Sequence, residues 1–94
     1  MIMANMETNS EERKVIDNVL QRDDVFRYKL LGRLQSDCEY YLNCGNRNIG
    51  RLWAGSVNLQ IKLMVELYNS FDEKPEWLTM DEIVVYGKEM AECD

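Results

Sequence analysis

Hydrophobic side chains recur along this chain at intervals of three and four residues, which is the spacing of one face of an α-helix. The first clear series joins Phe26, Leu30, Leu34, Cys38 and Tyr41. After an Asn- and Gly-rich connection, a second series joins Trp53, Val57, Ile61, Met64 and Tyr68. No segment sustains the period-two alternation of a half-buried strand. The pattern therefore predicts an all-α protein in which these two series share one core.

A shorter helix is expected before the first series, ending near Gln21. Residues 8–10 are Thr, Asn and Ser, and each of them can cap a helix start. A narrow apolar stripe follows, made of Val15, Ile16, Val19 and Leu20. Asp23 or Asp24 can cap the next helix. Since this break is weak, one bent helix over both segments is the alternative.

Turn and capping residues separate the remaining helices. The second helix should end near residue 43, because Gly45 tolerates the left-handed conformation that terminates helices. The third should begin near Leu52, and Pro75 breaks the next connection. Thr79 and Glu82 have the spacing of a capping box at the start of the last helix. The sequence thus predicts a small single-domain bundle of three to four helices, with 1–25 as an N-terminal extension and 26–92 as the helical domain.

The amino-acid composition bears on the cellular location of the chain and on its cofactors. Its 94 residues are 46% hydrophobic, and they contain neither an apolar run of membrane-spanning length nor a secretory leader. Three cysteines occur without any histidine, so neither a zinc site nor another cofactor is expected. Cys38 and Cys44 are interpreted as small core or near-core residues rather than nucleophiles. These features predict a cytoplasmic protein with no membrane association.

The net charge of −6 argues against general nucleic-acid binding. The charge is uneven, because the segment from Arg22 to Arg51 holds six basic and four acidic residues, giving +2 and leaving −8 for the remainder. A weakly basic middle in an acidic chain suits a protein partner better than a phosphate backbone.

A fragment of a phosphate-binding loop occurs at residues 45–52, where Gly45 and Gly50 match the two glycines of the motif. The lysine of the motif is replaced by Arg51, and its Mg²⁺-binding Ser or Thr by Leu52. The loop also follows a predicted helix rather than a strand. We therefore interpret it as a connector between helices, and we expect no nucleotide binding.

The remaining polar residues offer one candidate interface. The chain contains no histidine, the residue most often used in general acid–base catalysis. We therefore predict no enzyme activity and no catalytic residue. Asp37 lies four positions after Arg33, which predicts either an exposed ion pair or a buried carboxylate that orients Arg47. Arginine and tyrosine are enriched at interface hot spots. The predicted interaction residues are Arg33, Asp37, Tyr40, Arg47 and Arg51.

Separated short motifs carry a family resemblance over about residues 26–90. They are Leu34-Gln35-Ser36-Asp37-Cys38, Gly45-Asn46-Arg47, Leu52-Trp53-Ala54-Gly55, Glu66-Leu67-Tyr68-Asn69 and Trp77-Leu78-Thr79. In these motifs the chain resembles the eleventh large polyvalent protein-associated domain. The resemblance implies an accessory module of phages, plasmids or conjugative elements, either within very long proteins or as a short chain, and it implies no catalytic residues.

These observations predict a non-enzymatic protein-interaction module whose partner is another protein, with a homodimer also allowed. The alternative is a small acidic anti-defence inhibitor, resembling anti-CRISPR proteins, that occupies the nucleic-acid groove of a nuclease. Small size and the charge of −6 fit this alternative, whereas the basic middle segment fits it poorly.

Overall fold

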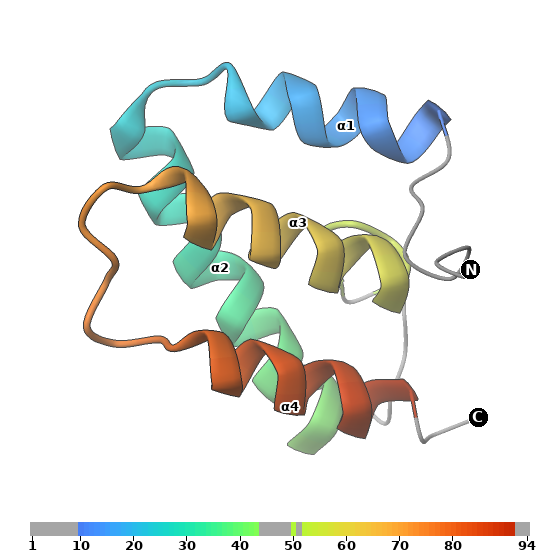
Figure 1. Ribbon diagram of the computed structural model, residues 1–94. Helices are drawn as coiled ribbons and strands as arrows, with labels where there is room; N and C mark the ends of the chain where they lie inside the picture. The colour runs from blue at the N-terminus through green and yellow to red at the C-terminus, as the bar shows by residue number, and fades with distance from the viewer. Residues whose placement is uncertain (1–9, 44–49, 51, 92–94) are drawn as a thin grey trace, which may run out of the picture.

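Four helices make up the fold of the computed structural model, which describes residues 10–43, 50 and 52–91. They are α1 (Ser10–Leu20), α2 (Asp24–Asn43), α3 (Val57–Ser70) and α4 (Met80–Ala91). In Figure 1, α1, α3 and α4 follow one another from top to bottom while α2 crosses behind α3. Helix α3 contacts each of the other three. The described residues contain no strand, and the prediction of an all-α bundle is confirmed.

Helices α1 and α2 are separate, as the first of the two sequence interpretations predicts. The Asp23 carboxylate accepts a hydrogen bond from the backbone N–H of Phe26 at 2.8 Å. This bond satisfies one of the free N–H groups at the start of α2. Asp23 therefore caps α2, and the alternative of one bent helix is wrong.

The start of α3 differs from the prediction. The helix begins at Val57 rather than near Leu52, because Gly55 has φ +80° and Ser56 is the N-cap. The Ser56 hydroxyl accepts from the N–H of Leu59 at 3.1 Å. A left-handed residue ends any helix running into it from the N-terminal side, so the segment before Ser56 folds as a tight turn.

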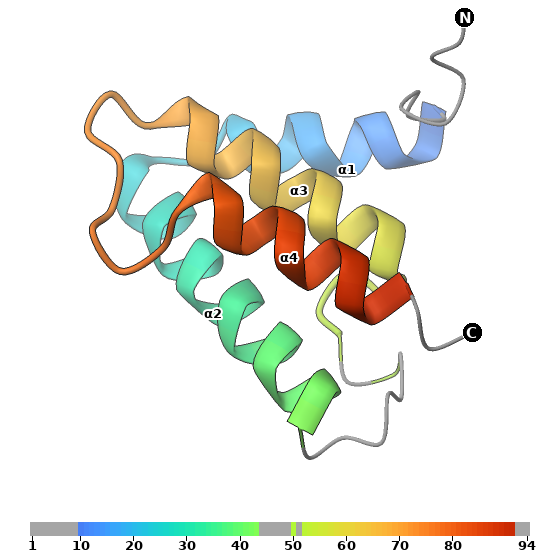
Figure 2. The ribbon, with the colours of Figure 1, turned by 60° about the horizontal axis from the view of Figure 1, so that its bottom comes forward.

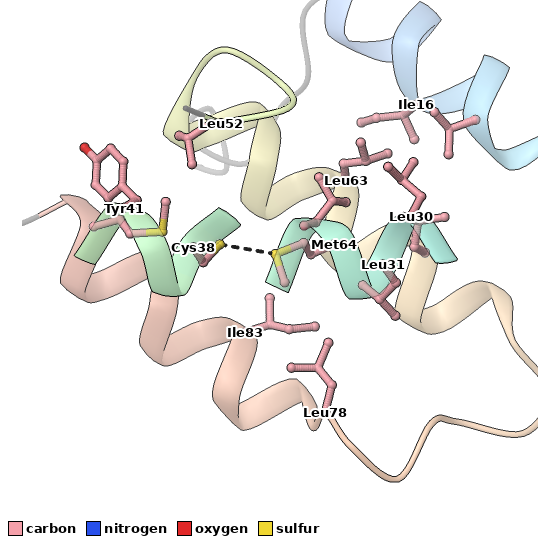
Figure 3. Packing of buried hydrophobic residues seen from close by; sticks show 14 residues of the cluster. Ile16, Leu30, Leu31, Cys38, Tyr41, Leu52, Leu63, Met64, Leu78 and Ile83 are labelled. Atoms are coloured by element: carbon pink, nitrogen blue, oxygen red, sulfur yellow. Dashed lines mark hydrogen bonds between the residues drawn. The ribbon is translucent and has the colours of Figure 1, made fainter. Parts of the chain in front are cut away.

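The core lies between all four helices and also takes in the Leu52 side chain. Figure 3 shows the cluster around Met64, with Cys38 and Ile83 on neighbouring helices. The thiol of Cys38 lies 3.6 Å from the Met64 sulfur, to which it donates. The largest side chains that are exposed to less than 2% are Ile16, Leu31, Leu34, Cys38, Gln60, Leu63, Met64, Leu67, Leu78, Ile83 and Met90.

The predicted core is partly wrong. Trp53 is 40% exposed, because the turn at Gly55 breaks the helical spacing that would have placed its ring beside Val57. Val57, Ile61 and Tyr68 are only partly buried and flank the core. The fully buried line of α3 consists instead of Gln60, Leu63, Met64 and Leu67. The face of α3 that meets the core is thus rotated from the predicted one, with only Met64 common to both.

The start of α4 follows the predicted capping box. The backbone N–H of Thr79 donates to the Glu82 carboxylate at 2.9 Å, and the N–H of Glu82 donates to the Thr79 hydroxyl at 3.1 Å. The N–H groups of Thr79 and Glu82 are thus each satisfied by the side chain of the other residue. The capping box prediction is confirmed.

Helix α1 packs against α3 through both apolar and charged contacts. Ile16 and Val19 are buried in the shared core. Lys62 on α3 pairs with Glu12 at 2.9 Å, and Arg13 on α1 pairs with Glu66 at 3.4 Å. In the part of the chain that the structure describes, no helix is long and apolar enough to span a membrane.

Candidate functional site

One side of α2 carries the largest group of predicted interaction residues. Phe26, Arg33, Asp37 and Tyr40 lie at helical steps of seven, four and three, so they form one stripe along the helix. Trp53 is attached to this stripe through Asp37, and Arg22 lies at its N-terminal end. We call the group of Arg22, Phe26, Arg33, Asp37, Tyr40 and Trp53 the α2–Trp53 surface.

Asp37 connects the α2 stripe to the turn that carries Trp53. One carboxylate oxygen, Oδ1, lies 3.3 Å from Arg33 Nε, and the other, Oδ2, accepts from the backbone N–H of Trp53 at 2.9 Å. The Asp37 side chain is 12% exposed, whereas that of Arg33 is 60% exposed. Asp37 is therefore a mostly buried carboxylate that holds a backbone turn, and Arg33 extends from it into solvent.

A buried glutamine also holds this turn. Gln60 is fully buried, and its side-chain oxygen accepts from the backbone N–H of Ala54 at 3.0 Å. Its amide nitrogen donates to the carbonyl of Leu34 on α2 at 3.2 Å. Buried polar groups satisfied in this way fix the geometry of the segments they join. Side chains from α2 and α3 thus pin two successive residues of the turn.

Trp53 lines a shallow hollow between the end of α1 and the start of α2. Arg22 and Phe26 line this hollow together with Asn18, Val19 and Gln21. The guanidinium of Arg22 lies 3.9 Å from the centre of the Phe26 ring, which is a cation–π contact. An indole, a phenyl ring and a guanidinium therefore surround one solvent-open depression.

Three of the five predicted interaction residues lie together in the structure. Arg33, Asp37 and Tyr40 share the α2 stripe, and Tyr40 is 39% exposed. Arg47 and Arg51 lie outside the described residues, as does the proposed contact between Asp37 and Arg47. Among the described residues, Asp37 pairs with Arg33 and with the Trp53 backbone.

A second aromatic group lies on another face of α2 and covers the α3–α4 connection. Tyr28 meets Trp77 edge to face with ring centres 5.3 Å apart, and it meets Phe71 in the same way at 5.7 Å. The indole N–H of Trp77 donates to the Tyr28 hydroxyl at 2.7 Å. Gln35 donates to the Trp77 carbonyl at 3.3 Å. We call Tyr28, Phe71 and Trp77 the Tyr28–Trp77 cluster.

Two groups that are not members of the α2–Trp53 surface have strongly raised pKa values. Burial raises the pKa of the Cys38 thiol to about 12, and the neighbouring Asp37 charge adds to the effect. Burial, followed by the hydrogen bond to Glu39, raises the pKa of Tyr86 to about 12. Both groups are protonated at neutral pH, so the Cys38 thiol is a core group rather than a nucleophile, as predicted. Cys44 lies outside the described residues.

The loop that resembles a phosphate-binding motif lies mostly outside the described residues. Of its described positions, Leu52 is 4% exposed and belongs to the hydrophobic core. This is the position at which a phosphate-binding loop would present its Mg²⁺ ligand. Within the described ranges, no group of three or more potential ligands of the His, Cys, Asp or Glu type is arranged to hold a metal ion.

The comparison with protein families gives a match over residues 24–90, to the model described as large polyvalent protein-associated domain 11. The chain belongs to this family. No curated protein and no solved structure matches the chain significantly. The family domain begins at the first residue of α2, so it contains α2, α3 and α4, and α1 lies outside it.

Sequence reasoning missed two parts of this arrangement. Gln60 lies at steps of three, four and seven from Leu63, Met64 and Leu67, and a polar residue on such an apolar face signals a buried hydrogen-bonding role. Arg22 and Phe26 are four positions apart, but they lie on either side of the helix start, so helical spacing alone does not predict their contact.

Proposed function

We propose that this chain is a non-enzymatic protein-interaction module of a phage, plasmid or conjugative element, and that it binds its partner through the α2–Trp53 surface. Membership of the polyvalent-protein-associated family supports an accessory role. The reduced, buried thiol of Cys38 is in keeping with a place of action in the cytoplasm.

The observation that carries the proposal is the way Trp53 is held. Its backbone turn is fixed by Asp37 and Gln60, yet its side chain remains 40% exposed. Among the described residues its indole N–H has no hydrogen-bond partner. A backbone turn that is already ordered loses little further conformational entropy when a partner covers its side chain, which favours binding. Tryptophan next to arginine is the composition typical of interface hot spots.

The charges around Trp53 indicate the chemistry of the partner. The guanidinium of Arg22 lies over the Phe26 ring, and Arg33 is mostly exposed. A guanidinium that stacks on a ring still has its N–H groups at the edge to pair with a carboxylate. We therefore propose that the partner presents an acidic segment with an apolar side chain that enters the hollow beside Trp53.

Selection from a randomised peptide display library tests this proposal directly. We expect the selected peptides to combine Asp or Glu with an aromatic or large aliphatic residue. Trp53→Ala and Arg33→Glu should each weaken their binding by about tenfold or more. Trp77→Ala is the matched control, because Trp77 is 38% exposed but belongs to the Tyr28–Trp77 cluster. Peptides that bind Trp53→Ala and Arg33→Glu as tightly as the parent chain would contradict the proposal.

The inhibitor alternative rests on a different surface. The connection between α3 and α4 exposes three carboxylates, those of Asp72, Glu73 and Glu76. An inhibitor that occupies a nucleic-acid groove would depend on this acidic segment. Under that alternative, changing all three residues to Lys would abolish binding to a basic nuclease groove, while Trp53→Ala would leave it unchanged.

A further inference from the structure

The outer face of α4 is apolar at its centre. Val84 and Val85 are 45% and 48% exposed, although they sit in the middle of a helix whose opposite side is buried in the core. Ile83 and Met90 form that buried side. In Figure 2, α4 lies in front of α3, with its outer face toward the viewer. Two adjacent exposed valines on a helix therefore have no covering element in the described part of the chain.

Two oppositely charged residues frame this valine pair. At about 100° per residue, Asp81 and Lys88 both point along the direction that bisects Val84 and Val85. Both charged residues are exposed, and neither makes an ion pair within the described ranges. Along the helix, this face therefore presents an acid (Asp81), two valines and a base (Lys88) in that order.

This pattern is complementary to itself when the helix direction is reversed. A two-fold axis between Val84 and Val85 places each of these valines opposite the other valine of a second copy. The same axis pairs Asp81 with Lys88 of the second copy, since each lies three residues outside the valine pair. A two-fold interface needs this kind of self-complementary surface.

The remaining charges on α4 do not oppose the pairing. The same axis places Glu82 opposite Gly87 of the second copy and Glu89 opposite Met80, so no acid faces an acid. The two helices are antiparallel, and each end with partial positive charge lies near an end with partial negative charge. We propose that two copies of this chain associate through antiparallel α4 helices, burying Val84 and Val85 between two Asp81–Lys88 ion pairs.

A single pair of 12-residue helices forms a small interface, so the dimer should be weak and visible only at high protein concentration. Sedimentation equilibrium from about 10 µM to 1 mM should show a reversible monomer–dimer equilibrium. A chain that remains monomeric over the whole range would overturn the proposal.

Charge reversal on α4 gives the decisive test. Asp81→Lys places two lysines against each other at both ends of the interface, and Lys88→Asp places two aspartates there. Each variant alone should dimerise at least about tenfold more weakly than the parent chain, because like charges then face each other. An equimolar mixture of the two variants restores one ion pair of opposite charges at each end, so it should form a heterodimer more tightly than either variant dimerises alone.

Control variants separate this interface from general charge effects. Glu76→Lys and Lys14→Glu make the same changes in net charge at positions outside α4, and they should leave dimerisation nearly unchanged. Melting curves show whether each variant is folded. Single variants that dimerise like the parent chain, or a mixture of folded variants that forms no heterodimer, would each overturn the proposal.

Discussion

Trp53 and Trp77 are exposed to nearly the same extent, 40% and 38%, yet the fold holds them differently. The Trp77 ring packs edge to face on Tyr28, and its indole N–H donates to the Tyr28 hydroxyl. Trp53 is held through its backbone: its own N–H donates to Asp37, and the N–H of the next residue, Ala54, donates to Gln60. Exposed area alone therefore does not distinguish the two side chains. We expect the indole of Trp77, whose polar atom is satisfied within the fold, to contribute to stability, and we propose that Trp53, held only through its backbone turn, is available to a partner.

The largest expected effect concerns the support beneath Trp53. Gln60→Ala removes the acceptor of the Ala54 N–H and leaves a cavity next to Leu34. We expect a loss of about 3–4 kcal/mol in the free energy of unfolding, measured by urea denaturation. Asn69→Ala, which removes an exposed amide from the same helix, is the control and should cost less than about 1 kcal/mol. Equal effects of the two changes would show that Gln60 does not support the turn.

The next effect distinguishes the tryptophans directly. Trp77→Ala removes the ring that packs edge to face on Tyr28 of α2 and deletes the hydrogen bond to the Tyr28 hydroxyl. It should lower the free energy of unfolding by about 2 kcal/mol in the same urea experiment. A cost no greater than that of Trp53→Ala would remove the difference between the two sites.

Alkaline pH should lower the stability of the whole core, and both tryptophans should report this loss equally. The thiol of Cys38 has a pKa raised from 9.0 to about 12, so the unfolded chain releases this proton first as the pH rises. Its contribution is fully present below pH 9 and should fall by about 1.4 kcal/mol at pH 10. Cys38→Ala should remove this part of the pH slope. Because the thiol lies in the shared core, urea unfolding followed by either indole should report the same loss.

A smaller effect is expected for the hydroxyl that holds Trp77. Tyr28→Phe should cost about 1 kcal/mol in the parent chain and much less in Trp77→Ala, because the hydrogen bond is then already absent. A double-mutant cycle measures this coupling. Additive costs would mean that the bond between the two side chains contributes nothing.

The smallest stability effect is expected for Trp53 itself. Trp53→Ala leaves both backbone anchors of its turn in place, so it should cost less than about 1 kcal/mol. Single-tryptophan variants should show that the peptides selected in the binding experiment shift the fluorescence of Trp53 and leave that of Trp77 unchanged. A shift confined to Trp77 would move the interface to the Tyr28–Trp77 cluster.

Periodicity and capping rules predict most of this fold because they depend on local sequence. The separate α1 and α2 and the Thr79–Glu82 capping box follow directly from residue type and spacing. The same spacing wrongly places Trp53 in the core, because it extends the helical period of Val57 through a turn. The left-handed conformation of Gly55 interrupts that period, and a glycine in the sequence allows this conformation without requiring it.

The candidate surface could be predicted only in part. Arg33, Asp37 and Tyr40 belong to one helix, so their spacing alone places them together. The hydrogen bond from Trp53 to Asp37 joins residues 16 positions apart, and the one from Gln60 to Leu34 joins residues 26 apart. Such contacts depend on how the helices pack, and this packing is not encoded in the spacing within any one of them.

Helix α1 has a consequence for the design of truncated chains. The family domain begins at Asp24, but Ile16 and Val19 of α1 are buried against the core, and Glu12 and Arg13 pair with side chains of α3. The evolutionary unit and the folding unit therefore have different N-terminal boundaries. Truncation at the family boundary would expose an apolar strip of α3 and leave Lys62 and Glu66 without their α1 partners. We therefore expect a chain of residues 24–90 to need another element that covers this strip in order to remain soluble.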